Sequence, residues 1–354
     1  PKIEQGLKST MAWVGGAALD GTFFDSGAIL RGSMLPGSDP AAKTFQSFYR
    51  LRDGTIRYAE GWPEIEGVEA FVSTSDSLID VVVTAGNSHG LSLDGARGTV
   101  RPAVDEGGER RNRLLVEGGA TGLTQDALNF LSASPLPDGL VDTVNNWRAA
   151  GDAQVAIDVH LLLGSGEPVD VRTELSIDEN NLALLDYGLD VSALSGQVVF
   201  DTRTGLDSSN LQGQLFSSPV SLQLGSAQSD RVIETITLAA SGRVAPQQLA
   251  DLALTSPLID SMLSQTDGVL EFTSQLFIEQ GGESLYPTTL EIQSTLEGVS
   301  IVGPDPLYKE AGTPVAFDLT LGFGENRQWH RGKLGERLEF DLSFEDTALT
   351  QGLV

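Results

Sequence analysis

The chain has no cysteine, few basic residues and no long run of apolar residues. The missing cysteines exclude disulfides, cysteine nucleophiles and thiolate metal sites. Only 22 Lys and Arg oppose 49 Asp and Glu, which gives a formal net charge of −27. A surface of that sign repels phosphate backbones, so we expect no nucleic-acid partner. No stretch approaches the roughly 18 apolar residues that a membrane-spanning helix needs.

The start of the sequence lacks the features of a secretion signal. It opens on Pro1 rather than Met, and no basic segment followed by an apolar one comes after it. We therefore expect the chain to be an internal piece of a longer protein. The absence of cysteine suits an oxidising compartment such as the periplasm.

Catalytic and metal-binding motifs are also scarce. The three histidines (His89, His160 and His330) show no metal-ligand spacing. No Gly-x-Ser-x-Gly elbow and no phosphate-binding loop occurs, and the acidic stretch 178–181 lacks the order of a calcium loop. We predict that the chain is not an enzyme and holds no cofactor or metal. Because any two carboxylates could serve a glycosidase, a carbohydrate-active β enzyme is kept as the least favoured alternative.

Several segments alternate apolar and polar residues, which is typical of strands with one dry face and one wet face. The clearest are 155–161, 169–175, 315–323 and 338–344. Helical patterns are confined to 124–147, where Thr124 is expected to cap the helix, and to 246–263, which begins at Pro246. The sequence therefore predicts a mainly β protein: an elongated repeat of twisted antiparallel sheet with short helices packed against it.

Two stretches look like copies of one unit. Ser-Pro-Leu occurs at 134–136 and again at 256–258, and Val-Val-Phe-Asp at 198–201 corresponds to Val-Ala-Phe-Asp at 315–318. Gly151 and Gly268 each open an apolar strand. We predict an N-terminal β segment over 1–114, repeat unit 1 over 115–237 and repeat unit 2 over 238–354. Since one repeat cannot bury its apolar face alone, stacked neighbours would form a continuous surface.

The N-terminal segment carries a more specific pattern. Residues 48–67 read FYRLRDGTIRYAEGWPEIEG. The residues that form the pattern are Asp53, Gly54, Tyr58 and Gly61-Trp62-Pro63. The stretches LLVEGGATG at 114–122 and LEGVSIVGPDPLYK at 296–309 extend the pattern. Together they resemble the YhdP branch of the AsmA-like family of Gram-negative bacteria over residues 10–345.

The resemblance implies a sheet folded into a lengthwise apolar groove that carries phospholipid acyl chains between the inner and outer membranes. It also implies a periplasmic location, an inner-membrane anchor through an N-terminal helix outside this sequence, and outer-membrane or other envelope proteins as further candidate partners. The candidate groove residues are apolar members of the alternating strands: Val155, Ile157, Val159, Leu161, Val171, Val198, Phe200, Leu222, Phe272, Leu276, Ile278, Val315, Phe317, Leu319, Phe340 and Leu342.

Alternation alone also fits a sealed core, because a core-facing strand and a lipid-facing strand have the same period. The main alternative is therefore a sealed β-repeat scaffold or adhesion module that binds protein or polysaccharide. Trp62, between Gly61 and Pro63, fits a tight corner whose indole plugs the core better than it fits a lipid-contacting groove edge.

A basic cluster stands out in so acidic a chain, and it has two interpretations. It fits either contact with anionic head groups or a hairpin with interstrand ion pairs. Its members are Arg327, His330, Arg331, Lys333 and Arg337. His160, which alternates with apolar neighbours, is expected on the solvent side of its strand.

Overall fold

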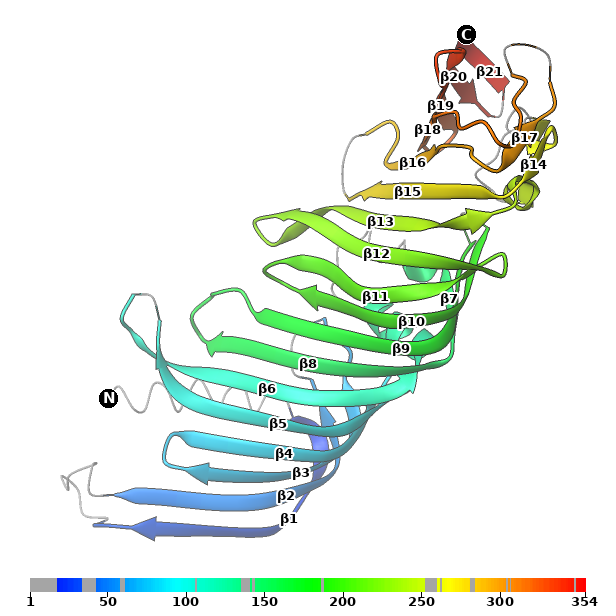
Figure 1. Ribbon diagram of the computed structural model, residues 1–354. Coiled ribbons are helices and arrows are strands. Elements are labelled where there is room, and N and C mark those ends of the chain that lie inside the picture. The colour runs from blue at the N-terminus through cyan, green and yellow to red at the C-terminus, as the bar shows by residue number, and fades with distance from the viewer. Residues whose placement is uncertain are drawn as a thin grey trace. The chain divides into compact units, whose positions relative to one another are not determined.

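The computed structural model describes residues 18–33, 43–57, 61–105, 107–134, 141, 144–185, 188–251, 260–261, 263–280, 284–303, 305, 307–346 and 348–354. Most of these residues lie in strands, as Figure 1 shows. Nineteen strands belong to one sheet, and β14 (Thr266–Gly268) and β17 (Val299–Ile301) form a small second one. The prediction of a mainly β, antiparallel fold is confirmed.

The chain divides into two compact units. Unit 1 comprises Pro1–Leu136, Asp152–Leu175 and Phe200–Arg203, and unit 2 comprises Pro137–Gly151, Ser176–Val199 and Thr204–Val354. The described strands of unit 1 are β1 (Ala18–Arg31), β2 (Thr44–Ile56), β3 (Ile65–Ser75), β4 (Leu78–Ser88), β5 (Leu91–Val104), β6 (Arg110–Leu123) and β8 (Asp152–Leu163). Two strands have residues in both units: β9 (Asp170–Leu184) and β10 (Leu189–Asp201).

Unit 2 holds the remaining strands of the large sheet. These are β7 (Trp147–Ala150), β11 (Gly205–Leu215), β12 (Ser218–Ser229), β13 (Val232–Val244), β15 (Leu270–Glu279), β16 (Thr288–Ser294), β18 (Phe317–Phe323), β19 (Arg327–Leu334), β20 (Leu338–Glu345) and β21 (Ala348–Leu353). From β11 to β21 each strand pairs antiparallel with the next strand of the large sheet. In unit 1 the same is true from β1 to β6, and β6 then pairs with β8.

Tight turns fix the register between neighbouring strands. The two-residue turns Phe216-Ser217, between β11 and β12, and Asp230-Arg231, between β12 and β13, have positive φ at both residues. This is the type I′ pattern, whose twist matches the right-handed twist of the strands that it joins. The β11–β12 pairing follows directly from its turn. Between β12 and β13 a register shift at Ala227 and Gln228 follows the turn, and it places Leu224 opposite Leu238.

Two short helices lie where the sequence predicts helical structure. Helix α2 covers Thr124–Ser132 and contacts β6 and β8 of unit 1. Thr124 was predicted as its cap, and this is wrong. Leu123 holds the N-cap position with an extended backbone, because β6 runs directly into the helix, and Thr124 is the first helical residue. The 3-10 helix η3 covers Pro246–Asp251 and begins at the predicted proline. Of the two Ser-Pro-Leu motifs, only Ser134 lies within the described residues.

The Gly-Trp-Pro segment forms the predicted corner. Gly61 has φ of 79°, Pro63 is buried, and the Trp62 ring lies 6.3 Å from that of Phe130 on α2. The geometry therefore fits the core-plugging role of the indole. Tyr58 lies outside the described residues.

Two predicted strands begin later than their alternation suggests. Val169 precedes β9, and Val315 precedes β18. The backbone N–H of Val315 donates to the carbonyl of Thr295, in the connection after β16, at 2.7 Å. That bond takes Val315 out of the regular ladder between β16 and β18, which begins at Phe317. The division into two sequence repeats stays a prediction.

Candidate functional site

Unit 2 has one apolar face that continues from strand to strand. In β12, β13 and β15 several apolar residues lie directly opposite apolar residues of the next strand. Leu224 faces Leu238, which in turn faces Leu276. Because residues directly opposite each other lie on the same side of a sheet, these side chains share one face. We call this side the apolar face of unit 2.

A row of leucines crosses this face at right angles to the strands. Its members, from β12 to β20, are Leu224, Leu238, Leu276, Leu290, Leu321, His330 and Leu342. At a spacing of about 4.8 Å per strand, six steps span about 29 Å. We call it the leucine row. A parallel row holds Leu211, Leu222, Ala240, Ser274, Ile292, Leu319, Gly332 and Phe340.

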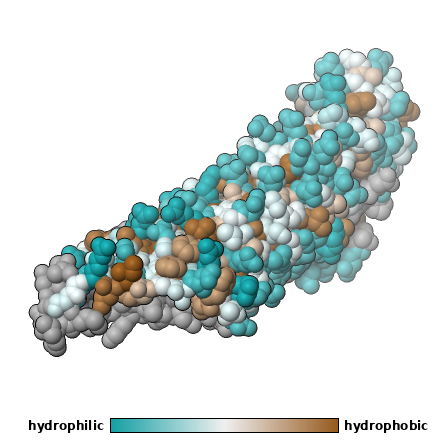
Figure 2. Space-filling view, turned by 90° about the horizontal axis from the view of Figure 1, so that it is seen from below, coloured by the Kyte–Doolittle hydropathy of each residue, from teal (hydrophilic) through white to brown (hydrophobic). Residues whose placement is uncertain are grey.

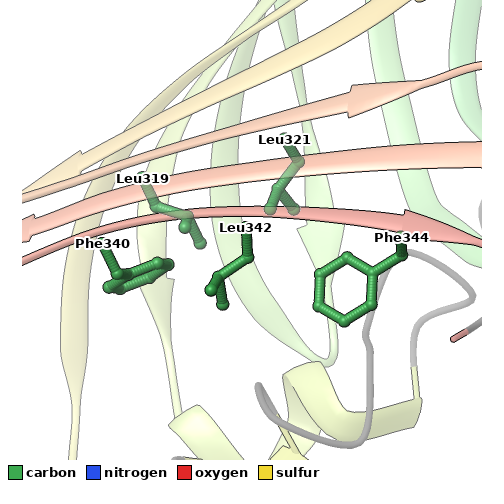
Figure 3. Packing of buried hydrophobic residues seen from close by; sticks show 5 residues of the cluster. All are labelled: Leu319, Leu321, Phe340, Leu342 and Phe344. Carbon is green, nitrogen blue, oxygen red and sulfur yellow. The ribbon is translucent and has the colours of Figure 1, made fainter. Parts of the chain in front are cut away.

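The C-terminal part of this face holds a cluster of buried side chains. Figure 3 shows Leu319 and Leu321 of β18 and Phe340, Leu342 and Phe344 of β20 projecting from the same side of their strands. All five are buried. Further toward β12, Leu222, Leu224 and Leu238 are only half-buried. The face is therefore covered at β18–β20 and partly open over β12 and β13.

The opposite face of unit 2 is polar. Over β12 to β16 it carries Ser221, Gln223, Ser241, Thr273, Gln275, Glu291 and Gln293. These residues line a shallow hollow of about 520 Å³. Alternation thus separates an apolar side from a water-facing side, as the sequence predicts.

The basic cluster is divided between the two faces. Arg327 pairs with Glu345 at 3.2 Å and Arg331 with Asp341 at 2.7 Å, both between β19 and β20. The hydrogen bonds from the Arg331 and Trp329 side chains lower the pKa of Asp341. These pairs match the hairpin interpretation of the cluster.

His330 does not belong with that cluster, because it lies on the apolar face of unit 2. It is fully buried, and neither ring nitrogen has a hydrogen-bond partner. Its ring centroid lies 4.7 Å from that of Phe344. Burial lowers the pKa of His330 from 6.5 to about 4, so the imidazole is neutral at pH 7.

Unit 1 also has an apolar face. Leu114, Val116, Gly118 and Ala120 of β6 lie opposite Leu161, Val159, Ile157 and Val155 of β8. On the other side of β6, Leu114 lies opposite Val100 of β5 and Val116 opposite Gly98. A second group of buried residues, Leu51, Val68 and Ala70, lies on β2 and β3. His160 points to the opposite side, where it is exposed and lies 3.0 Å from Asp158.

The structure brings many of the predicted groove residues onto these two faces. Val155, Ile157, Val159 and Leu161 share the apolar face of unit 1, and Leu222, Phe272, Leu276, Ile278, Phe317, Leu319, Phe340 and Leu342 share that of unit 2. Val171, Val198 and Phe200 lie in β9 and β10, the strands with residues in both units, and their role stays a prediction. Val315 lies outside any strand.

Leu224, Leu238, Leu290 and Leu321 of the leucine row were not among the predicted residues. Each follows the alternation of its own strand, so the signal was available in the sequence. In the part of the chain that the structure describes, no group of three His, Asp or Glu residues is placed to hold a metal ion. None of the described helices is long and apolar enough to cross a membrane.

Comparison with known proteins settles the relationship of the chain. The family model described as YhdP protein matches residues 8–353. The chain belongs to the YhdP family. It is 22% identical over 309 residues to the protein named intermembrane phospholipid transporter YhdP of Escherichia coli (strain K12). That alignment covers 84% of this chain and 23% of the relative, so the chain spans less than a quarter of the relative's length. No solved structure matches the chain.

Proposed function

We propose that the chain carries phospholipid acyl chains along its apolar faces, as one segment of a periplasmic protein that moves phospholipid between the inner and outer membranes. The observation that carries this proposal is the leucine row of unit 2, which presents a leucine on six of seven neighbouring strands of the sheet and is interrupted only by His330 on β19. The name of the Escherichia coli relative supports phospholipid as the cargo.

The chemistry of the row suits an acyl chain. Each methylene that leaves water for an apolar surface contributes about 0.8 kcal/mol. Leu224 and Leu238, on neighbouring strands, both keep part of their surface open and offer an acyl chain similar contacts. Transport of this kind needs no bond to be made or broken, and the proposal assigns no catalytic residue.

The half-buried part of the face is the proposed entry region for the acyl chain. Leu222, Leu224 and Leu238 keep part of their surface open, whereas the polar residues on the other side of the same strands face water. Among the described strands of unit 2, each contacts mainly the strands next to it in the sheet.

Site-specific crosslinking tests the proposal. A photoreactive amino acid placed at Leu222 or Leu238 should crosslink to phospholipid when the chain is illuminated in a Gram-negative envelope. The same amino acid at Gln223 or Gln275, on the opposite face of the same or a neighbouring strand, is the matched control and should give no lipid adduct. Equal labelling at all four positions, or none at Leu222 and Leu238, would contradict the proposal.

A sealed scaffold is the second candidate, and one observation favours it. The five side chains in Figure 3 are all buried, which is what a closed core between β18 and β20 requires. If the whole face is sealed in this way, Leu238→Asp should leave the binding of environment-sensitive dyes to the chain unchanged. Dye binding that falls in Leu238→Asp but not in Gln275→Asp would instead favour the open face.

A further inference from the structure

Unit 1 has a second feature that the transport proposal leaves unexplained, on the side of β1–β6 away from the apolar face. Large apolar side chains on this side are exposed: Ile29 by 56%, Phe48 by 46%, Leu78 by 43% and Val82 by 41%. The strand pairing places Phe71 on this side as well, because it lies opposite Arg50 of β2 and Val82 of β4. We call these residues, together with Phe71, the aromatic patch.

The aromatic patch encloses a hollow. A depression of about 400 Å³ is lined by Ile29, Phe48, Phe71, Leu78 and neighbouring polar residues that include Asp80. The rings of Phe48 and Phe71 lie 6.3 Å apart. Figure 2 shows apolar side chains gathering beside polar ones at the end that carries β1 and β2. An exposed apolar hollow of this kind is typical of a contact surface.

Arginines border the patch on the same side of the sheet. The Arg50 guanidinium lies 5.6 Å from the centre of the Phe71 ring. Arg97 lies opposite Val82 and pairs with Asp80 at 3.1 Å, and Glu117 lies opposite it on β6. At Arg97 the positive charge is therefore accompanied by the carboxylates of Asp80 and Glu117.

Further along β5 and β6 on the same face, beyond the pair Thr99 and Leu115, the charges are different. Arg101 of β5 lies directly opposite Arg113 of β6, and both are exposed. Among the described residues, neither has a carboxylate within ion-pair distance. Two like charges directly opposite each other destabilise a sheet, so this pair is costly in the free chain. In a chain with a net charge of −27, such a pair points to an anionic ligand.

The ends of β1 and β2 decide between a protein and a membrane as the partner. On the apolar face at these strand ends, Leu30 and Phe45 lie directly opposite each other and are 48% and 47% exposed. Ile29 and Phe48 are exposed on the other face of the same strands. A protein partner would cover one face, whereas the interfacial region of a bilayer surrounds both faces of an inserted strand end.

We propose that the arginine-bordered aromatic patch of unit 1 docks on the surface of a bilayer that contains anionic phospholipid. Phe48, Leu78 and the strand ends with Leu30 and Phe45 enter the interface, while Arg101 and Arg113 contact lipid phosphates. This contact is separate from the leucine row, because all of its residues lie in unit 1.

Vesicle flotation tests the proposal with the 354-residue chain. We expect the chain to float with vesicles that mix phosphatidylcholine and phosphatidylglycerol, and to stay behind with phosphatidylcholine alone. Added salt should weaken the binding because it screens surface charge. The double variant Arg101→Glu/Arg113→Glu should bind the mixed vesicles at least about tenfold more weakly.

Two controls separate docking from folding and from transport. Arg243→Gln changes an exposed arginine on the opposite face of unit 2, which pairs with Glu271 at 3.1 Å, and it should bind vesicles normally. Arg101→Glu/Arg113→Glu should keep the far-ultraviolet spectrum of the parent and the lipid crosslink at Leu238. Binding that ignores lipid charge, or that survives the double charge reversal, would overturn the proposal. Capture of an acidic protein with no vesicle binding would also overturn it.

Discussion

His330 lies directly opposite Leu321, on the apolar face of unit 2, with no hydrogen-bond partner for either ring nitrogen. It occupies the place where the leucine row would otherwise continue from Leu321 to Leu342. Leaving a buried polar group unsatisfied costs about 1–3 kcal/mol. His330 therefore lowers the stability of the folded chain at a position where the surrounding residues suit an apolar side chain.

Replacing this histidine should stabilise the chain. We expect His330→Leu to raise the free energy of unfolding at pH 7 by about 1 kcal/mol or more, because it removes the desolvated imidazole and completes the leucine row. Urea denaturation of the two proteins measures the difference. A variant less stable than the parent would show that the ring makes an interaction that this account lacks.

Stability should also depend on pH through the same residue. Burial lowers the pKa of His330 to about 4 in the folded chain, against 6.5 as the ordinary value. Between these two values the unfolded chain binds the proton more tightly than the folded chain does, so the free energy of unfolding falls as pH drops from about 6.5 to 4. The full shift corresponds to about 3 kcal/mol.

His330→Leu is the control for the pH effect. Subtracting its pH profile from that of the parent removes the contribution of the carboxylates, which both proteins share. The difference should be flat above pH 7 and should grow as the solution is acidified. A difference that stays constant from pH 7 to 4 would mean that His330 is solvated in the folded chain.

The two faces of β15 should respond differently to truncation. Leu276→Ala removes a buried side chain from the leucine row and should destabilise the chain by about 2–5 kcal/mol. Gln275→Ala changes the adjacent exposed residue on the opposite face and should alter stability by no more than about 0.5 kcal/mol. Thermal unfolding of the pair gives the comparison, and similar losses in both would contradict the assignment of faces.

Gly332 makes room for Phe340 across β19 and β20. The two residues lie directly opposite each other, and a Cβ at Gly332 would overlap the Phe340 ring. Gly332→Ala should therefore cost about 1–3 kcal/mol through overpacking. Adding Phe340→Leu should recover part of that loss, and a double-mutant cycle measures the coupling. Strictly additive effects would show that the ring does not occupy the space above the glycine.

The sequence was sufficient to predict strands but not their register. Leu224, Leu238 and Leu276 each alternate along their own strands, yet their alignment depends on the Asp230-Arg231 turn, on the register shift at Ala227 and Gln228, and on how β13 meets β15. A change of one residue at any of these places would misalign the leucines. Those constraints come from three-dimensional pairing, which alternation within a single strand does not contain.

His330 illustrates a different limit. Its nearness in sequence to Arg327, Arg331 and Lys333 suggested one basic cluster, whereas the alternation of β19 places His330, Gly332 and Leu334 together on the apolar face. The alternating pattern was the better guide, because side chains on a strand change face at each residue. The alternation of β19 predicts an apolar environment for His330, which the structure shows, whereas the charged neighbours in sequence predicted a polar one.

Native mass spectrometry of the chain purified in the presence of phospholipid tests the central proposal most directly. The account predicts one or more bound phospholipids per chain, reduced by Leu238→Asp and retained in Gln275→Asp, which adds the same charge on the opposite face. A lipid-free mass with no uptake from added phospholipid would contradict it, and so would equal lipid loss in both variants while their folds remain intact.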